Sequence, residues 1–233
     1  MTRLLLSCGL AWALACGTAF GQDSPDIFAK PSEAVAQNSV KLRAVVIDMP
    51  PETVWVSLGF GFCIGAPYKK AWTKGRERQP VSLYAPAFKA GLEKAGYKVV
   101  TPGEDNLFEA EAASADYEAG AVITNIKIDG CIAAVPPFNS ASPVRGDASM
   151  TIDWQIYSPI NKQVVARVST TGKAHLANSI PGGEQRLALD SFADNAAALA
   201  ANGDFRAAMT ASKRLADGFR RRMRRARFFL AAV

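Results

Sequence analysis

The feature that most constrains the fold is a strict alternation of apolar and polar residues over 146–157, which resumes over 163–175 after a turn at 158–162. In the first segment, one set of alternating positions holds Met150, Ile152, Trp154 and Ile156, and the other holds Ser149, Thr151, Asp153 and Gln155. Successive side chains of a strand point to opposite faces of the sheet. The pattern therefore predicts a hairpin in a sheet with one buried face and one face in water.

The rest of the chain adds both helices and further strands to this hairpin. Strands are predicted over 41–49, 53–63, 97–100 and 121–135, helices over 83–95, 107–117, 184–200 and 204–228, and a basic loop over 64–80. Ser82 and Asp204 are the expected N-caps of two of the helices. A helix followed by Gly96 and a strand is typical of an α/β unit. The sequence predicts an α/β (α+β) domain over 41–201, with a mixed or antiparallel sheet, helices packed on one face, and C-terminal helices.

Residues 1–21 have the pattern of a secretory signal peptide. Arg3 precedes an apolar run over 4–15, and Ala19-Phe20-Gly21 places small residues where a signal peptidase reads them, so cleavage is expected before Gln22. The run is shorter than the roughly 20 residues that span a bilayer. The alternative is a buried N-terminal helix. The mature chain is expected in the periplasm, with outer-membrane association or secretion as alternatives.

The cysteines fit an oxidising compartment. A loose lipoprotein-type motif ending at Cys16 gives an alternative to cleavage before Gln22, in which Cys16 carries a lipid. The segment 22–40 is a leader or linker. After residue 21 the sequence contains two cysteines, Cys63 and Cys131. In an exported chain two cysteines most simply form a disulfide. That bridge closes a loop of 68 residues, worth about 4 kcal/mol in the chain-entropy model, and the alternative is two separate buried thiols. Neither cysteine lies in a CxxC motif or a Cys/His cluster, so no metal or other cofactor is expected.

The positive charge of the chain is concentrated at its C-terminus. The formal net charge is +6, but eight basic residues and a single acid lie in 213–233. Because Arg3 leaves with the signal peptide, residues 22–212 are mildly acidic. This distribution argues against a nucleic-acid-binding domain.

Segment 202–233 is predicted to be a basic amphipathic helix. Apolar residues recur there at helical spacing and share one face, while arginines fill the other. Such a helix favours contact with anionic lipid, peptidoglycan or an envelope protein. The residues expected to make that contact are Arg220, Arg221, Arg222, Arg224, Arg225 and Arg227. The alternative is a helix that docks on the domain through its apolar face.

No catalytic constellation is predicted. His175 is the only histidine, and no serine near it in the sequence lies in a GxSxG or GDSGG motif, which argues against a Ser-His-Asp triad. The glycines of 59–65 lack dinucleotide-loop spacing, and a strand pattern runs through them. Asp48, Asp153 and Asp190 show no spacing that pairs them, although the two carboxylates of a glycosidase meet in space rather than in sequence. The sequence therefore favours a non-catalytic protein over an enzyme.

Aromatic residues supply the remaining candidates for a binding surface. Trp55, Trp72, Trp154, Tyr84 and Tyr157 can line a groove for a sugar or peptidoglycan, or they can pack in the core and on the sheet face. Trp72 differs from the others because it lies among the basic residues of the 64–80 loop. We therefore expect Trp72 to be exposed and to contact a partner.

Three segments of the chain resemble domains of bacterial envelope proteins. They are Gly96-Tyr97-Lys98-Val99-Val100, ADYEAGAVITNIKID at 115–129, and TIDWQIYSPINKQVVARVSTTG at 151–172. Together they resemble small α/β domains of the curli-secretion lipoprotein, of periplasmic lipoproteins that assist outer-membrane or peptidoglycan assembly, and of the Tol-system β-propeller protein. Asn125 stands where those domains usually have glycine. The resemblance implies an exported, non-catalytic envelope accessory or interaction protein.

The hairpin 151–172 also resembles a region found upstream of the trypsin-like domain in exported proteases. This second resemblance implies the alternative function, an N-terminal or regulatory module related to exported trypsin-like serine proteases. A hydrolase whose site carries no recognisable motif is the other enzyme-linked alternative.

Overall fold

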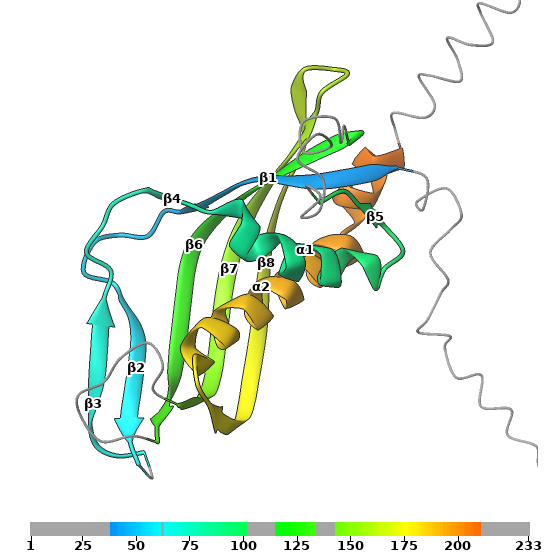
Figure 1. Ribbon diagram of the computed structural model, residues 1–233. Helices are drawn as coiled ribbons and strands as arrows, with labels where there is room; N and C mark the ends of the chain where they lie inside the picture. The colour runs from blue at the N-terminus through cyan, green and yellow to red at the C-terminus, as the bar shows by residue number, and fades with distance from the viewer. Residues whose placement is uncertain (1–37, 62, 102–114, 134–142, 211–233) are drawn as a thin grey trace, which may run out of the picture. The chain divides into compact units, whose positions relative to one another are not determined.

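The computed structural model describes residues 38–61, 63–101, 115–133 and 143–210, all of which belong to the larger of two units, 31–233 (Figure 1). In chain order the elements are β1 (Ser39–Ile47), β2 (Val54–Phe60), β3 (Ile64–Ala71), β4 (Glu77–Gln79), α1 (Val81–Glu93), β5 (Lys98–Val99), β6 (Tyr117–Ile132), β7 (Val144–Ser158), β8 (Gln163–Ile180) and α2 (Gly183–Ala201). A further helix begins at Gly203, and its described part runs to Thr210.

A mixed sheet of eight strands is organised around β6. β1 and β2 both run parallel to β6 and follow one another along it, with Ile47 beside Ile123 and Val56 beside Ile128. β7 pairs with β6 in antiparallel orientation, and β8 pairs with β7. β4 and β5 pair with β1, and β3 pairs with β2. The sheet therefore has β8 as one lateral strand and β3 as another.

Helices α1 and α2 cover one face of this sheet, and their aromatic side chains meet around Trp154 of β7 (Figure 1). The ring of Trp154 is fully buried, 5.8 Å from the ring of Phe88 on α1 and 5.5 Å from that of Phe192 on α2. The alternating apolar residues of β7 all point into this core, because Met150, Ile152 and Ile156 are buried as well. The other set of alternating residues on β7 lies on the uncovered face.

A buried polar network fixes α2 on the sheet. The indole Nε1 of Trp154 donates to Thr170 Oγ1 at 2.8 Å, and that hydroxyl donates to Asn195 Oδ1 at 2.7 Å. The Asn195 amide in turn donates to the carbonyl oxygens of Met150 and Ser191, both at 2.9 Å. The side-chain groups of Trp154, Thr170 and Asn195 that form this network thus all have hydrogen-bond partners, as buried polar atoms require.

Glycine at position 172 lets α2 approach β8 closely. A Cβ at this position would collide with the carbonyl oxygen of Ser191 and would lie 2.5 Å from the backbone nitrogen of Asn195. Only a residue without a side chain leaves room for the helix at this point. Gly172 therefore sets the distance between the helix layer and the sheet.

The predicted fold class is confirmed, and the predicted hairpin is present as β7 and β8. Gly96 has a φ of 85° just beyond α1, as expected of a residue that ends a helix. The loop predicted over 64–80 is wrong, because it contains β3 and β4. β3 exposes most of its described side chains, so its sequence lacks the alternation that identifies a half-buried strand.

Three smaller predictions also need correction. Pro80 precedes α1, and Ser82 lies inside the helix and does not cap it. Asn202 Oδ1 accepts from the backbone N–H groups of Asp204 and Phe205 at 2.8 and 3.2 Å, so Asn202 is the cap of the last helix instead of Asp204. Of the helix predicted over 107–117, residues 107–114 lie outside the described residues, and Tyr117 begins β6.

Candidate functional site

The candidate site is a pocket of about 380 Å³ on the face of the sheet that carries the helices, which we call the Trp55–Trp72 pocket. Its walls come from β1, β2, β3, β4, β6, α1, α2 and the connection from β3 to β4. The lining residues are Ile47, Trp55, Lys70, Trp72, Lys74, Glu77, Gln79, Tyr84, Ile126, Glu184, Gln185 and Ala188. This volume falls within the range of small-molecule sites, roughly 300–1,000 Å³.

Two indole rings form the aromatic part of the pocket. The rings of Trp55 and Trp72 meet edge to face, with 6.5 Å between their centroids and 83° between their planes. Trp72 is held by its backbone, because its N–H donates to the Thr53 carbonyl oxygen at 2.8 Å and its carbonyl oxygen accepts from Glu52 N–H at 2.7 Å. Its indole Nε1 donates to the Gly75 carbonyl oxygen at 3.3 Å.

The expectation that Trp72 is exposed is wrong. Only 9% of its surface is accessible, and it belongs to the hydrophobic core cluster. Lys69, Arg76 and Arg78 are exposed, whereas Trp72 pairs through its backbone with residues 52 and 53 and its ring packs in the core. Trp72 can therefore meet a partner only inside the pocket. Trp55 is only partly buried, and it lines the same pocket.

Two ion pairs contribute the charges of the pocket. Lys70 Nζ lies 2.7 Å from Glu184 Oε2, which connects β3 to the first turn of α2, and Lys74 Nζ lies 2.7 Å from Glu77 Oε1. The Lys70 ammonium also lies 5.8 Å from the centre of the Trp55 ring, close enough for a cation–π interaction. Both positive charges are therefore matched by a carboxylate within the pocket itself.

Neutral polar groups complete the lining. The side chains of Gln79, Gln185 and Tyr84 form no hydrogen bond with another residue among those that the structure describes. Burial raises the pKa of the Tyr84 hydroxyl above its usual value, so this group remains a protonated donor at physiological pH. An amide and a phenol both donate and accept hydrogen bonds. The pocket can thus bind a molecule through aromatic contact and neutral hydrogen bonds.

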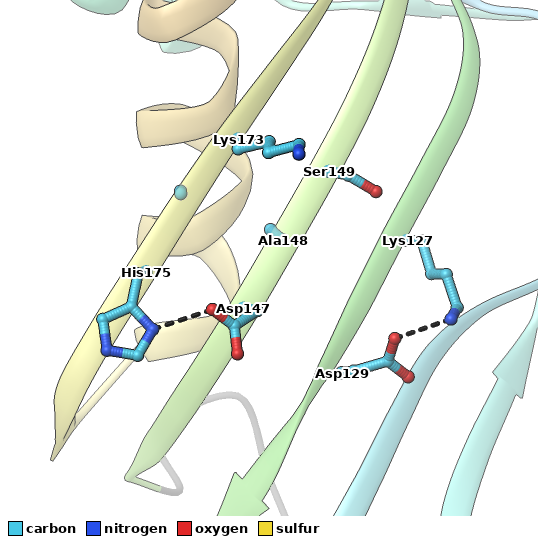
Figure 2. Close-up of a pocket in the computed structure, with 8 residues that line it drawn as sticks. Lys127, Asp129, Asp147, Ala148, Ser149, Lys173 and His175 are labelled. Atoms are coloured by element: carbon cyan, nitrogen blue, oxygen red, sulfur yellow. Dashed lines mark hydrogen bonds and ion pairs between the residues drawn. The ribbon is translucent and has the colours of Figure 1, made fainter.

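A second group of polar side chains lies on the uncovered face of the sheet, where Figure 2 shows them on β6, β7 and β8. His175 Nδ1 lies 2.7 Å from Asp147 Oδ1, and Lys127 Nζ lies 2.8 Å from Asp129 Oδ2. Ser149 belongs to the same hollow, but its register partner on β8 is Lys173, whereas His175 pairs with Asp147. In the part of the chain that the structure describes, no hydrogen bond joins Ser149 to His175.

This arrangement is not a Ser-His-Asp triad, because the histidine contacts the acid but not the serine. The side chains of His175 and Asp147 are 66% and 74% exposed, so water surrounds the pair. Triad chemistry relies on a serine hydrogen-bonded to the base and an acid buried behind it. Among the described residues, no group of three or more His, Cys, Asp or Glu side chains is arranged to hold a metal ion.

The two cysteines among the described residues are joined. Cys63, in the turn between β2 and β3, forms a disulfide with Cys131 near the end of β6, with 5.3 Å between their Cα atoms. The bond attaches the β2–β3 hairpin to β6, beside the parallel pairing of β2 and β6. The disulfide thus reinforces the part of the sheet that carries Trp55 and Lys70.

The other residues named from the sequence are distributed as follows. Trp154 is a core residue, and Tyr157 lies on β7 among the side chains of the uncovered face, so neither reaches the pocket. Arg220, Arg221, Arg222, Arg224, Arg225 and Arg227 lie outside the described residues. Sequence reasoning did not identify Glu77, Gln79, Glu184 and Gln185 as pocket residues. No local pattern marks them, because the fold brings them together from β4 and α2.

Searches against known proteins supply no family for this chain. No protein-family model and no curated protein matches it. Among solved structures it is similar to protein XCC0632 from Xanthomonas campestris, of the DUF330 family model, with 10% identity, a TM-score of 0.34, and coverage of 79% of this chain and 92% of that one.

Two further solved structures show comparable similarity. PelC from Paraburkholderia phytofirmans, a dodecamer, has 12% identity and a TM-score of 0.31 over 70% of this chain and 88% of that one. A minor lipoprotein from Acinetobacter baumannii has 8% identity and a TM-score of 0.30 over 72% and 92%. Similarity at this level transfers neither residues nor activity. Within the described part of the chain, none of the helices combines the length and the hydropathy of a membrane span.

Proposed function

We propose that this protein is an exported, non-catalytic accessory protein of the bacterial envelope, and that it binds a partner in the Trp55–Trp72 pocket. The observation that carries this proposal is the pocket itself, in which two indole rings adjoin amide and phenol groups that have no described hydrogen-bond partner. Such a lining is suited to recognition, because aromatic surface supplies affinity and a few polar groups supply orientation.

Export is supported by the signal-peptide pattern of residues 1–21 and by the Cys63–Cys131 disulfide. Disulfides persist outside the reducing cytoplasm. The resemblance of the 96–100, 115–129 and 151–172 segments to envelope domains supports a role in outer-membrane or peptidoglycan assembly. The partner at the pocket is then an envelope protein or peptidoglycan, and anionic lipid is the partner of the basic segment 213–233, whose charge attracts anionic surfaces.

Photo-crosslinking in the periplasm tests this function. A photoreactive amino acid replaces Gln185, which is exposed at the pocket, and in a matched variant it replaces Asn161, which is exposed in the turn between β7 and β8. We expect a crosslinked envelope component with the first variant that is absent with the second. Equal labelling by both variants, or none by either, contradicts binding at the pocket.

One observation favours a second candidate function. The contact of His175 with Asp147, with Ser149 in the same hollow, is the observation on which a hydrolase acting on the uncovered face of the sheet would rest. In such an enzyme the serine would have to move to the histidine when substrate binds. Hydrolysis of ester or peptide substrates by the purified protein, abolished by Ser149→Ala and by His175→Ala, would establish this alternative. We expect no such activity.

A further inference from the structure

The chemistry of the Trp55–Trp72 pocket restricts the charge of its ligand. Lys70 and Lys74 each have a carboxylate partner within the lining, Glu184 and Glu77 respectively, at 2.7 Å. A charged ligand would find no counter-charge without a partner among the described lining residues. A neutral ligand leaves both pairs intact. The pocket therefore favours a molecule without net charge.

The aromatic rings and the polar groups of the lining further restrict the chemical class of the ligand. A quaternary or primary ammonium group binds over an indole face, but here the Lys70 ammonium, 5.8 Å from the centre of the Trp55 ring, would repel a second positive charge. A purely apolar chain would cover the hydroxyl of Tyr84 and the amide of Gln79 without offering them a partner. Leaving such groups unsatisfied costs about 1–3 kcal/mol each. The ligand must therefore offer both apolar surface and neutral hydrogen-bonding groups.

We propose that the Trp55–Trp72 pocket binds a unit of a neutral saccharide, an inference that rests on the proposed function and names its ligand. A sugar ring has a face of C–H groups that packs on an indole, and a rim of hydroxyls that donate and accept. Gln79 and Gln185 present groups of the matching kind on β4 and α2, and Tyr84 presents one on α1. Trp55 provides the stacking surface, and Trp72, held at 83° to it, forms the adjoining wall.

Calorimetric titration of the full mature chain tests this inference. The probes are short cello-, xylo- and chito-oligosaccharides, which are neutral, with galacturonate and glucosamine oligomers as charged counterparts. We expect at least one neutral series to bind, and its affinity to change less than twofold when salt rises from about 0.05 to about 0.5 M. Tighter binding of a charged series, or strong dependence on salt, overturns the inference.

Substitutions of pocket residues test whether the saccharide binds in the Trp55–Trp72 pocket. Trp55→Ala removes the stacking surface and is expected to weaken oligosaccharide binding by about tenfold, whereas Trp55→Phe keeps part of the affinity. Gln185→Ala changes an exposed side chain, so it should weaken binding while thermal unfolding stays unchanged. The matched control is Tyr157→Ala, on the uncovered face, which should bind like the original chain. Saccharide binding that survives Trp55→Ala and Gln185→Ala places the site elsewhere and refutes the inference.

The outcomes separate this inference from the proposed function. If no saccharide binds but the photoreactive variant at Gln185 still captures a protein or a lipid, the saccharide inference fails and the proposed function stands. If no saccharide binds and the Gln185 variant captures nothing, both fail. If a saccharide binds and the captured component is a glycan, both are supported.

Discussion

Replacing Asn195 by alanine gives the sharpest test of the packing between α2 and the sheet. The Asn195 side chain is fully buried and makes hydrogen bonds with Thr170 Oγ1, the Met150 carbonyl and the Ser191 carbonyl, at 2.7 to 2.9 Å. A net value of about 1 kcal/mol per hydrogen bond gives a loss of about 3 kcal/mol. The higher helix propensity of alanine restores at most about 0.7 kcal/mol. We therefore expect a destabilisation of about 2–3 kcal/mol, or roughly 4–12 °C in Tm for a domain of this size.

Urea unfolding followed by circular dichroism measures this change, and the slope with denaturant should stay constant while the midpoint falls. Asn195→Asp should destabilise more than Asn195→Ala, because a carboxylate would face the two carbonyl oxygens that the amide now donates to. Asn178→Ala, at an exposed position of β8, is the control and should change stability by less than about 0.5 kcal/mol. An aspartate variant as stable as the alanine variant would refute the network.

Four other outcomes are expected. Gly172→Ala should lower the urea midpoint more than Asn178→Ala does, because the new methyl group collides with the carbonyl oxygen of Ser191; an unchanged midpoint would show that α2 lies further from β8. Intact mass spectrometry should find the mature chain two hydrogens lighter than its reduced form, and free thiols at Cys63 and Cys131 would contradict the disulfide. Deletion of 213–233 should weaken binding to anionic vesicles, and equal binding would exclude a lipid role for that segment. His175→Ala should leave the affinity of the pocket unchanged in the same titrations, because His175 lies on the opposite face; a weaker affinity would connect the two faces.

The strands and helices that could be predicted from the sequence are those with one side in the core and the other side in water. β7 alternates because one side faces the core around Trp154 and the other faces water, so its sequence carries the full pattern. β3 pairs only with β2, and side chains on both of its sides are exposed, so nothing in 64–71 distinguishes it from a loop. α1 shows a periodic apolar face and a terminal glycine, whereas its N-cap, Pro80, follows none of the residue preferences on which the prediction relied.

The site was less predictable than the fold, because its residues belong together only in three dimensions. The tryptophans at 55 and 72 were recognisable as binding candidates from their residue type alone. The burial of Trp72, however, depends on a backbone pairing with Glu52 and Thr53, which the sequence does not indicate. Glu184 lies 114 residues from Lys70 in the chain, and its contact with Lys70 follows from where α2 starts on the sheet.

The attachment of the β2–β3 hairpin decides how well the pocket keeps its shape. One wall belongs to this hairpin and the other to α2, and three connections position the hairpin: the pairing of β2 with β6, the Cys63–Cys131 bond at the turn, and the Lys70–Glu184 ion pair. The disulfide lies at the turn, whereas the ion pair spans the pocket itself. An ion pair with side chains 36% and 25% exposed contributes at most about 1 kcal/mol to folding. Strand pairing and the disulfide therefore hold the hairpin in place, and the ion pair joins it to α2 and balances the charge of the pocket.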